Sequence, residues 1–345
     1  MTWTLLAIPG DGIGQEVIPQ AVRVVQAVDP EVQVVWAEAG WATFRQKGTA
    51  LPETTLRLAQ GSDAVLFGAT ASPPYRVAGY RSPILALRRA FELCVNLRPI
   101  RLWPGVAALH PRLAVWVVRE NCEGLYIQEE RSPEPGVAEA VRRITRQRSL
   151  AVAQEAFRLA MRLAESADRP PRVTVVHKAN VLPLTDGLFR EAALEVARAF
   201  PQVEVEEMLV DAAAMHLVRS PERFVVILAP NLYGDILSDL AAGLAGGLGL
   251  APSANLGQGT PVFEPVHGSA PDITGRGVAN PTAAILAAAL ALDHLGRHQA
   301  ARWVEQALER TLQEGYVTPD LGGEATTVTF TDRVLHHLAT LRENS

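Results

Sequence analysis

Short apolar runs alternate with longer amphipathic patterns along almost the whole chain, and this alternation limits the possible folds more than any other feature. Such alternation is typical of parallel strands joined by helices. The expected strands are 5–8, 64–67, 112–119, 173–176 and 224–228, and the expected helices are 15–27, 83–91, 185–199, 211–219 and 235–248. The sequence therefore predicts an α/β fold.

The composition restricts the possible partners. A net charge of −5 over 345 residues offers no general attraction for a polyanion, so no nucleic-acid partner is expected. The two cysteines, Cys94 in an apolar helical stretch and Cys122 in a loop, provide neither a disulfide framework nor a zinc spacing, which favours the cytoplasm. The chain begins directly with an apolar strand, and its longest apolar runs are too short for a bilayer, so no membrane association is expected.

Of the 32 basic residues only two are lysines, Lys47 and Lys178. Arginine stays protonated at any working pH, whereas a lysine amine can exchange protons when burial and neighbouring charges favour it. Lys178 follows an apolar run that predicts a buried strand, and strand ends are where α/β proteins place their chemistry. Lys178 is therefore a candidate acid/base group, although a solvated surface lysine fits its position equally well.

Three aspartates form the strongest candidate for a metal site. Asp235 and Asp239 are four residues apart at the start of an expected helix, so they project from one face, and Asp211 ends an apolar strand. Carboxylate oxygens are ligands for a hard cation such as Mg²⁺ or Mn²⁺. The alternative is that no metal binds here, because aspartates in the first turn of a helix are also stabilised by the helix dipole.

Three arginines, Arg88, Arg98 and Arg119, each lie beside an apolar segment. The planar guanidinium pairs bidentately with carboxylates, so three converging arginines would suit a substrate with several carboxylates. Unless they converge, each is an ordinary solvated side chain.

A loop at 264–272, followed by residues 277–282, is suited to a dinucleotide. Its glycine, serine and backbone amides can receive a pyrophosphate, and Asp272 can accept hydrogen bonds from both ribose hydroxyls. A carboxylate there repels a 2′-phosphate, so NAD is favoured over NADP. The glycines of 10–14 do not match the Rossmann fingerprint, because its third glycine position is Gln15, and they predict a tight turn between a strand and a helix.

Residues 128–148 are rich in charge, proline and arginine and have little apolar periodicity. Such a segment can be an arm that pairs with a second subunit, or a plain surface loop.

Taken together, six motifs resemble the β-decarboxylating dehydrogenases, which act on isopropylmalate, isocitrate, homoisocitrate and tartrate. The motifs are 8–14 (IPGDGIG), 96–99 (NLRP), 119–121 (REN), 177–180 (HKAN), 234–239 (GDILSD) and 267–272 (HGSAPD). The resemblance implies an isopropylmalate-dehydrogenase-like two-domain α/β fold without a Rossmann nucleotide site. It also implies a cofactor-binding domain from 1–100 plus 251–345, a substrate and dimerisation domain from 101–250 that includes the arm, and a homodimer or homotetramer with shared active sites.

The resemblance also implies residue roles. Tyr126, Lys178 and Asp211 would be catalytic, and the metal would bind Asp235, Asp239 and an Asp211 that comes from the partner subunit. The substrate-binding residues would be Ser72, Leu85, Arg88, Arg98, Arg119, Tyr126, Lys178 and Asn180. The NAD-binding residues would be Ser72, Asn180, Glu264, His267, Gly268, Ser269, Ala270, Asp272 and Asn280.

Within the family, the substrate is a small 2-hydroxy polycarboxylate. Residues 119–126 and 239–244 resemble the homoisocitrate and isocitrate enzymes, and residues 79–89 resemble homoisocitrate enzymes. This similarity predicts oxidative decarboxylation of (2R,3S)-homoisocitrate to 2-oxoadipate and CO₂, a step of lysine biosynthesis. The apolar Leu85 leaves 3-isopropylmalate, and therefore leucine biosynthesis, as an alternative. Isocitrate and a non-catalytic regulatory subunit are the others.

Overall fold

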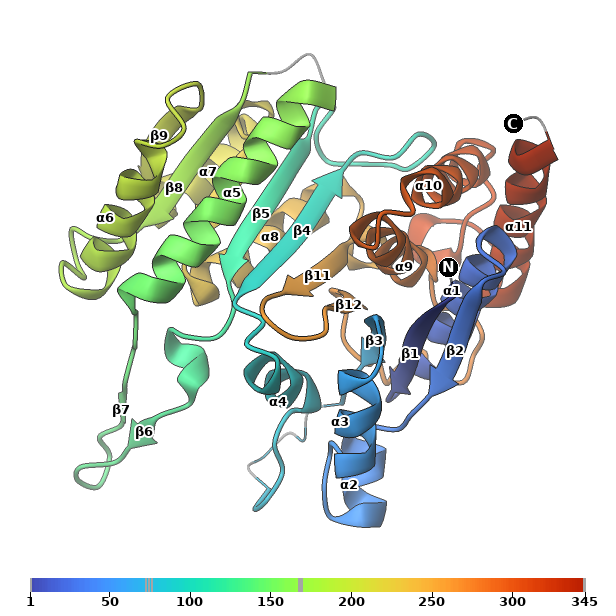
Figure 1. Ribbon diagram of the computed structural model, residues 1–345, viewed down its shortest axis with the longest axis horizontal. Coiled ribbons are helices and arrows are strands. Elements are labelled where there is room, and N and C mark those ends of the chain that lie inside the picture. The colour runs from blue at the N-terminus through green and yellow to red at the C-terminus, as the bar shows by residue number, and fades with distance from the viewer. Residues whose placement is uncertain (1, 72, 74, 76, 167–169, 344–345) are drawn as a thin grey trace. The chain divides into compact units, whose positions relative to one another are not determined.

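Buried strands of branched apolar residues form the centre of each of two compact units. The computed structural model describes residues 2–71, 73, 75, 77–166 and 170–343. Unit 1 comprises Met1–Phe91, Leu102–Leu109 and Ala245–Ser345, so both chain ends belong to it, and unit 2 comprises Glu92–Arg101 and His110–Leu244. Each unit combines a predominantly parallel set of strands with packed helices, which confirms the predicted α/β fold (Figure 1).

Unit 1 has five strands in the order β2-β1-β3-β12-β11. They are β1 (Trp3–Gly10), β2 (Val32–Trp36), β3 (Ala64–Ala69), β11 (Pro252–Leu256) and β12 (Val262–Pro265). The first four in this order are parallel, and β11 joins β12 antiparallel through the intervening hairpin. Every residue of β3 is buried, as expected for a central strand with both faces covered.

The helices of unit 1 are α1 (Gly14–Val28), α2 (Trp41–Lys47), α3 (Glu53–Gln60), α4 (Pro83–Ala90), α9 (Thr282–His294), α10 (His298–Gln313) and α11 (Thr327–Glu343), with short 3-10 turns η3 (Leu248–Leu250) and η4 (Pro319–Leu321). Helix α9 is made almost entirely of alanine, leucine and isoleucine and is buried over ten of its positions. It packs against α1, α10 and the strands β11 and β12, because a helix that is apolar on all sides needs neighbours on all sides.

Unit 2 has the strand order β4-β5-β10-β8-β9. Its strands are β4 (Val95–Arg101), β5 (Ala114–Glu120), β8 (Arg172–His177), β9 (Glu204–Leu209) and β10 (Val226–Ala229). Strands β4 and β5 are antiparallel and the remaining pairs are parallel. The carboxyl ends of β5, β10, β8 and β9 therefore meet at one edge, where an α/β site is expected.

Four helices cover this sheet, namely α5 (Arg146–Ser166), α6 (Thr185–Ala197), α7 (Val210–Arg219) and α8 (Asn231–Ala245). Helices α5 and α6 lie on the face towards the viewer and α7 and α8 lie behind it (Figure 1). In α5 the buried positions recur at helical spacing, at Val152, Ala153, Ala156, Phe157 and Ala160. Short 3-10 turns η1 (Leu125–Ile127) and η2 (Pro221–Arg223) complete the unit.

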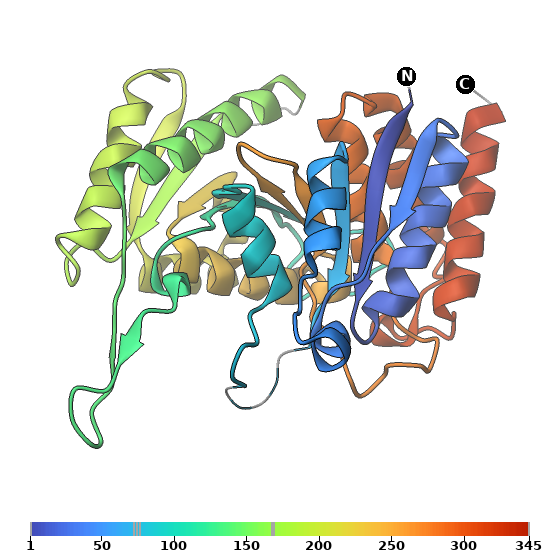
Figure 2. The same ribbon diagram turned by 60° about the horizontal axis from the view of Figure 1, so that its bottom comes forward.

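The charged segment after η1 forms an arm. Its strands β6 (Glu130–Arg131) and β7 (Glu139–Ala140) pair antiparallel, and residues 128–141 are all exposed. Ion pairs join Arg131 to Glu139 at 2.6 Å and Arg143 to Glu129 at 2.7 Å. Two views show the arm extending away from the sheet and helices of unit 2 (Figure 2).

Two local predictions were wrong. Helix α8 begins at Asn231, so Asp235 lies in its second turn and not in its first. Cys94 lies in the loop directly before β4, not in a helix, whereas Cys122 is in a loop as predicted. None of the helices in the described part of the chain is both long and apolar enough to cross a membrane.

The turn at 10–14 is built around a buried aspartate. One Asp11 carboxylate oxygen accepts hydrogen bonds from the backbone N–H of Trp41 (2.7 Å) and Ala71 (3.0 Å), and the other accepts one from Ala42 (2.9 Å). Asp11 therefore caps the start of α2 from a distant part of the sequence.

We expect Asp11→Ala to lower the free energy of unfolding by about 2–4 kcal/mol, because three N–H donors lose a charged acceptor. Urea denaturation measures the change. Asp332→Asn is the control: Asp332 pairs with Arg23 on the surface and is about half exposed, so its loss should cost no more than about 0.5 kcal/mol. Equal effects of the two substitutions would contradict the capping role of Asp11.

Candidate active site

Arg119 is held at the carboxyl end of β5 by the first two turns of α8. Its Nε and Nη2 donate to Oδ1 of Asn231 at 3.0 and 2.7 Å, and its Nη1 donates to Asp235. A Cβ at Gly234 would lie 2.8 Å from the Arg119 side chain, so glycine lets α8 approach this strand. The Arg119 side chain is 1% exposed, and its guanidinium pairs with the carboxylate of Asp235.

Arg98, from the neighbouring strand β4, meets the same helix. Its Nη2 lies 3.2 Å from Asp235, and its Nη1 lies 3.2 Å from Asp239 and donates to Ser238 Oγ at 2.7 Å. Asn96, on the same strand, accepts from Arg98 Nε at 2.9 Å. The predicted convergence of Arg98 and Arg119 is therefore present in unit 2, with both groups fixed by hydrogen bonds.

Tyr126, in η1, donates its hydroxyl proton to the second oxygen of Asp235, and the Arg119 guanidinium lies 4.9 Å from the centre of its ring. Burial is the largest cause of a raised pKa of Tyr126; Arg119 opposes it, and the hydrogen bond to Asp235 adds to it. The phenol therefore keeps its proton at neutral pH, as a proton donor must.

Asp239 lies one turn after Asp235 with a half-exposed side chain. Burial raises the pKa of Asp239, Arg98 lowers it, and the like charge of Asp235 raises it. Two carboxylates on one helix face, one of them open to solvent, form a donor set that fits a hard divalent cation. Among the residues that the structure describes, no three carboxylate, imidazole or thiol groups of one chain come together as a metal cluster, and Asp211 lies elsewhere in unit 2.

Lys178 and Asp211 form an ion pair with each other. Strands β8 and β9 are parallel with His177 opposite Leu209, so the residues that follow the two strands are neighbours. The Lys178 side chain is one-quarter exposed and that of Asp211 is about two-thirds exposed. The Lys178 amine lowers the pKa of the Asp211 carboxyl.

A buried carboxylate positions the backbone of Lys178. Asp186, at the start of α6, accepts from the Lys178 N–H at 2.6 Å and pairs with Arg142 at 2.6 Å. Arg142 also donates to Tyr233 Oη at 2.9 Å and stacks on its ring. The base of the arm is thereby linked both to the Lys178 loop and to α8.

Arg88, the third predicted arginine, belongs to α4 of unit 1 and pairs there with Glu264 at 2.9 Å. Asn255 donates to the same Glu264 oxygen at 2.8 Å. Leu85, one turn earlier on α4, is half-buried. Arg88 and Glu264, predicted for different ligands, are therefore direct partners.

The predicted cofactor loop packs on the turn that contains Gly12. The Ile13 N–H donates to Ser269 O at 3.0 Å, and a Cβ at Gly12 would lie 2.1 Å from that oxygen. Burial lowers the pKa of His267, so its imidazole is neutral, and its Nε2 is buried with no hydrogen-bond partner among the described residues. A buried ring nitrogen without a partner fits a dinucleotide that supplies one.

The other predicted cofactor residues have mixed surroundings. Asp272 is exposed, as recognition of a ribose requires, and Gly268 is also exposed. Asn280 is buried and donates to Asp320 at 3.0 Å. Asn180, in the turn after Lys178, is exposed, and Ser72 lies outside the described residues.

Sequence reasoning missed the residues that hold the arginines and the lysine, namely Asn96, Arg142, Asp186, Asn231 and Ser238. It also missed the buried carboxylate Glu120. Asn231, Asp186 and Asn96 are fully buried polar groups. Spacing gave no signal for Ser238 and Asn231, which lie 140 and 112 residues from the arginines that they hold, whereas Asn96 is only two residues from Arg98.

The family model described as isocitrate/isopropylmalate dehydrogenase matches residues 4–334. This chain belongs to that family. The chain is 51% identical to isocitrate/homoisocitrate dehydrogenase of Thermus thermophilus, over 99% of this chain and 100% of the relative. It is 47% identical to 3-isopropylmalate dehydrogenase of Methanothermobacter thermautotrophicus, over 97% and 98%.

Among solved structures, isocitrate dehydrogenase from Methylococcus capsulatus superposes with a TM-score of 0.92 at 40% identity, covering 98% of this chain and 99% of that one. The protein is therefore an enzyme, a β-decarboxylating dehydrogenase of a family that uses NAD and a divalent metal such as Mg²⁺ or Mn²⁺. The names of the relatives differ in substrate.

Glu120 follows Arg119 on β5 and accepts hydrogen bonds from the N–H groups of Cys122 and Glu123. Burial raises the pKa of Glu120 from its ordinary 4.5 to about 7, and the two backbone donors oppose this. Because the folded state binds this proton more tightly than the unfolded state, the stability that it contributes is complete below pH 4.5 and is lost as the pH rises to about 7.

We therefore expect wild type to lose stability relative to Glu120→Gln between pH 4.5 and about 7, with a slope of at most about 1.4 kcal/mol per pH unit. Urea unfolding of both proteins across this range gives the difference, in which the other titrating groups cancel. Parallel stability curves would show that Glu120 does not titrate there.

Proposed function

We propose that this enzyme catalyses NAD-dependent, metal-dependent oxidative decarboxylation of (2R,3S)-homoisocitrate to 2-oxoadipate and CO₂, a step of lysine biosynthesis. The observation that carries the proposal is the convergence of Arg98, Arg119 and Tyr126 on Asp235 of α8. Two fixed guanidinium groups suit a substrate with adjacent carboxylates, and a protonated phenol beside them suits the final proton transfer.

The proposed roles of the chain's own residues follow from their chemistry. Arg98 and Arg119 orient the substrate carboxylates; Lys178, with Asp211 beside it, removes the proton of the substrate hydroxyl; and Tyr126 returns a proton to carbon after CO₂ leaves. Asp235, Asp239 and Asp211 would hold Mg²⁺ or Mn²⁺, which, when bound, polarises the hydroxyl and the carbonyl formed from it. The 264–272 loop would hold NAD, and the exposed Asp272 carboxylate disfavours the 2′-phosphate of NADP.

We further propose that two copies of the chain share each site, in a homodimer or homotetramer. Lys178 and Asp211 pair with each other, apart from the contacts of Asp235 with Arg98, Arg119 and Tyr126, so each chain offers two sets of groups that can serve different sites. The exposed arm is suited to pairing with a second copy, because an edge hairpin with free backbone groups can extend another sheet.

The substrate's distal group is the least constrained part of the proposal. The half-buried Leu85 cannot pair a distal carboxylate, so chain length and neighbouring polar groups such as Arg81 must provide the preference. Two similar proteins are named for different substrates: one is an isocitrate/homoisocitrate dehydrogenase and the other a 3-isopropylmalate dehydrogenase. 3-Isopropylmalate is therefore the second candidate, favoured by the apolar Leu85, and isocitrate is the third.

A non-catalytic regulatory subunit is the remaining alternative. Such a subunit should have lost an acid of the cluster or the lysine and tyrosine pair, whereas this chain has all of them.

The two cysteines of the chain are unbridged, which favours a reducing compartment such as the cytoplasm.

The role of Lys178 is tested by Lys178→Arg, which keeps the positive charge but cannot release a proton near neutral pH. We expect less than about a tenth of the wild-type kcat, equivalent to more than about 1.4 kcal/mol of transition-state stabilisation. Lys47→Arg is the matched control, because Lys47 pairs with Glu38 on the surface at 2.8 Å and should leave kcat unchanged. A Lys178→Arg enzyme with wild-type kcat would mean that this residue supplies only charge.

The function itself is tested by steady-state kinetics with homoisocitrate, isocitrate and 3-isopropylmalate, each with NAD⁺ and Mg²⁺. We expect the highest kcat/KM for homoisocitrate, measurable turnover of another substrate, and loss of activity in EDTA. Leu85→Arg should shift the preference towards tricarboxylates by supplying a bidentate cation. A higher kcat/KM for 3-isopropylmalate would assign the enzyme to leucine biosynthesis, and no turnover of any of the three would support the regulatory subunit.

A further inference from the structure

The only two cysteines of this chain lie just beyond the paired ends of β4 and β5 in unit 2, where Val95 is opposite Glu120. The N–H of Asn121, next to Cys122, donates to the carbonyl oxygen of Cys94 at 2.9 Å, which joins the start of β4 to the end of β5. The Cys122 thiol hydrogen-bonds to the Cys94 sulfur, and both residues are half-buried and unbridged. Two thiols at neighbouring positions of a paired strand end are placed for oxidation to one disulfide.

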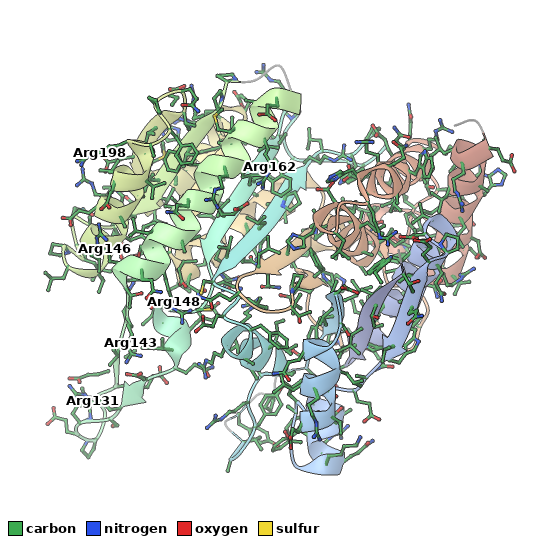
Figure 3. All side chains as sticks on the ribbon, viewed as in Figure 1. Arg131, Arg143, Arg146, Arg148, Arg162 and Arg198 are labelled. Atoms are coloured by element: carbon green, nitrogen blue, oxygen red, sulfur yellow. The ribbon has the colours of Figure 1, made fainter. Side chains whose placement is uncertain are left out.

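The surroundings make the two thiols chemically different. Arg148 lies in the first turn of α5 (Figure 3). Its Nη1 donates to Cys94 Sγ at 2.9 Å. The hydrogen bond from Cys122 lowers the pKa of Cys94; burial opposes this, and the charge of Arg148 adds to the lowering. The hydrogen bond to Cys94 and burial raise the pKa of Cys122. One sulfur is therefore favoured as a nucleophile while the other keeps its proton.

We propose that Cys94 and Cys122 are a site of reversible oxidation by peroxides. The Cys94 thiolate attacks one oxygen of the peroxide, the O–O bond breaks, and the sulfur becomes a sulfenic acid while hydroxide leaves. The Cys122 sulfur then attacks the sulfenic sulfur, the S–O bond breaks, and the oxygen leaves as water with the thiol proton. The peroxide receives the two electrons that the thiols lose, and a dithiol reductant restores both thiols.

The bridge would join the loop directly before β4 to the loop that leads from β5 to η1. Neither thiol is among the residues proposed for binding or chemistry, so this site does not depend on the proposed function. A cross-link between distant positions reduces the conformational freedom of the unfolded chain, so the oxidised enzyme should resist urea better than the reduced enzyme.

Hydrogen peroxide at near-stoichiometric concentration, applied to the native full-length enzyme, tests the proposal. We expect Ellman's reagent to find two thiols before treatment and none after it, with the chain lighter by two hydrogen atoms and a Cys94–Cys122 linked peptide in a non-reducing digest. Dithiothreitol should reverse all three changes and lower the urea midpoint again. Two free thiols after treatment, or a link between different chains, would overturn the proposal.

Three variants separate the roles of the groups. In Cys122→Thr, a substitution of similar size, Cys94 should stop at a sulfenic acid that dimedone traps. Arg148→Gln should slow the loss of thiols by about three- to tenfold, because the cation beside the Cys94 sulfur is removed. Arg162→Gln, at the other end of α5 and paired with Glu155 at 2.9 Å, is the control and should react at the wild-type rate (Figure 3). Equal rates in Arg148→Gln and wild type would overturn the activation by Arg148.

Discussion

The carboxylate of Asp235 is the interaction on which the rest of the site depends. Arg98 from β4, Arg119 from β5 and Tyr126 from η1 all contact it, so one acidic group on α8 fixes three elements. Two nearly buried guanidinium groups would be costly without it, because unpaired buried charge is strongly destabilising. Glycine at 234 permits this arrangement, since any side chain there would meet Arg119.

The same cluster explains how binding and chemistry can be combined. Asn96, Asn231 and Ser238 hydrogen-bond to the guanidinium groups of the two arginines. These groups are therefore oriented before a ligand binds, which reduces the entropy lost on binding. Asp239, one turn further along α8, is half-exposed and adds the second oxygen donor that a hard cation needs. Lys178 and Asp211 lie after two adjacent parallel strands and are linked through Asp186 and Arg142 to the base of the arm.

Features of the fold that depend on residues close together in the sequence could be predicted from the sequence. The apolar runs at 64–67 and 173–176 lie within β3 and β8, and the glycine-rich turn at 10–14 joins β1 to α1. Features that depend on contacts between distant parts of the chain could not be predicted in this way. The residues around Cys94 suggested a helix, but the segment that follows, Val95–Arg101, is a strand that pairs antiparallel with β5. Helix α8 was expected to start at Asp235, but it starts four residues earlier and includes Gly234, a residue that usually disfavours a helix. Ser238 and Asn231 lie 140 and 112 residues from Arg98 and Arg119, so spacing alone could not identify them. Asp186 lies eight residues after Lys178, but its contact with the Lys178 N–H depends on the turn between β8 and α6.

We propose that Lys178 and Asp211 of one chain complete the Asp235 site of another. Subunit complementation between Asp235→Asn and Lys178→Ala tests it most directly, because each homo-oligomer should be inactive while a mixed dimer contains one intact site. After unfolding the two variants together and refolding them as an equal mixture, we expect about a quarter of the wild-type activity from random pairing. Activity no greater than that of the separate variants, with mixed oligomers present by native mass spectrometry, would contradict the shared site.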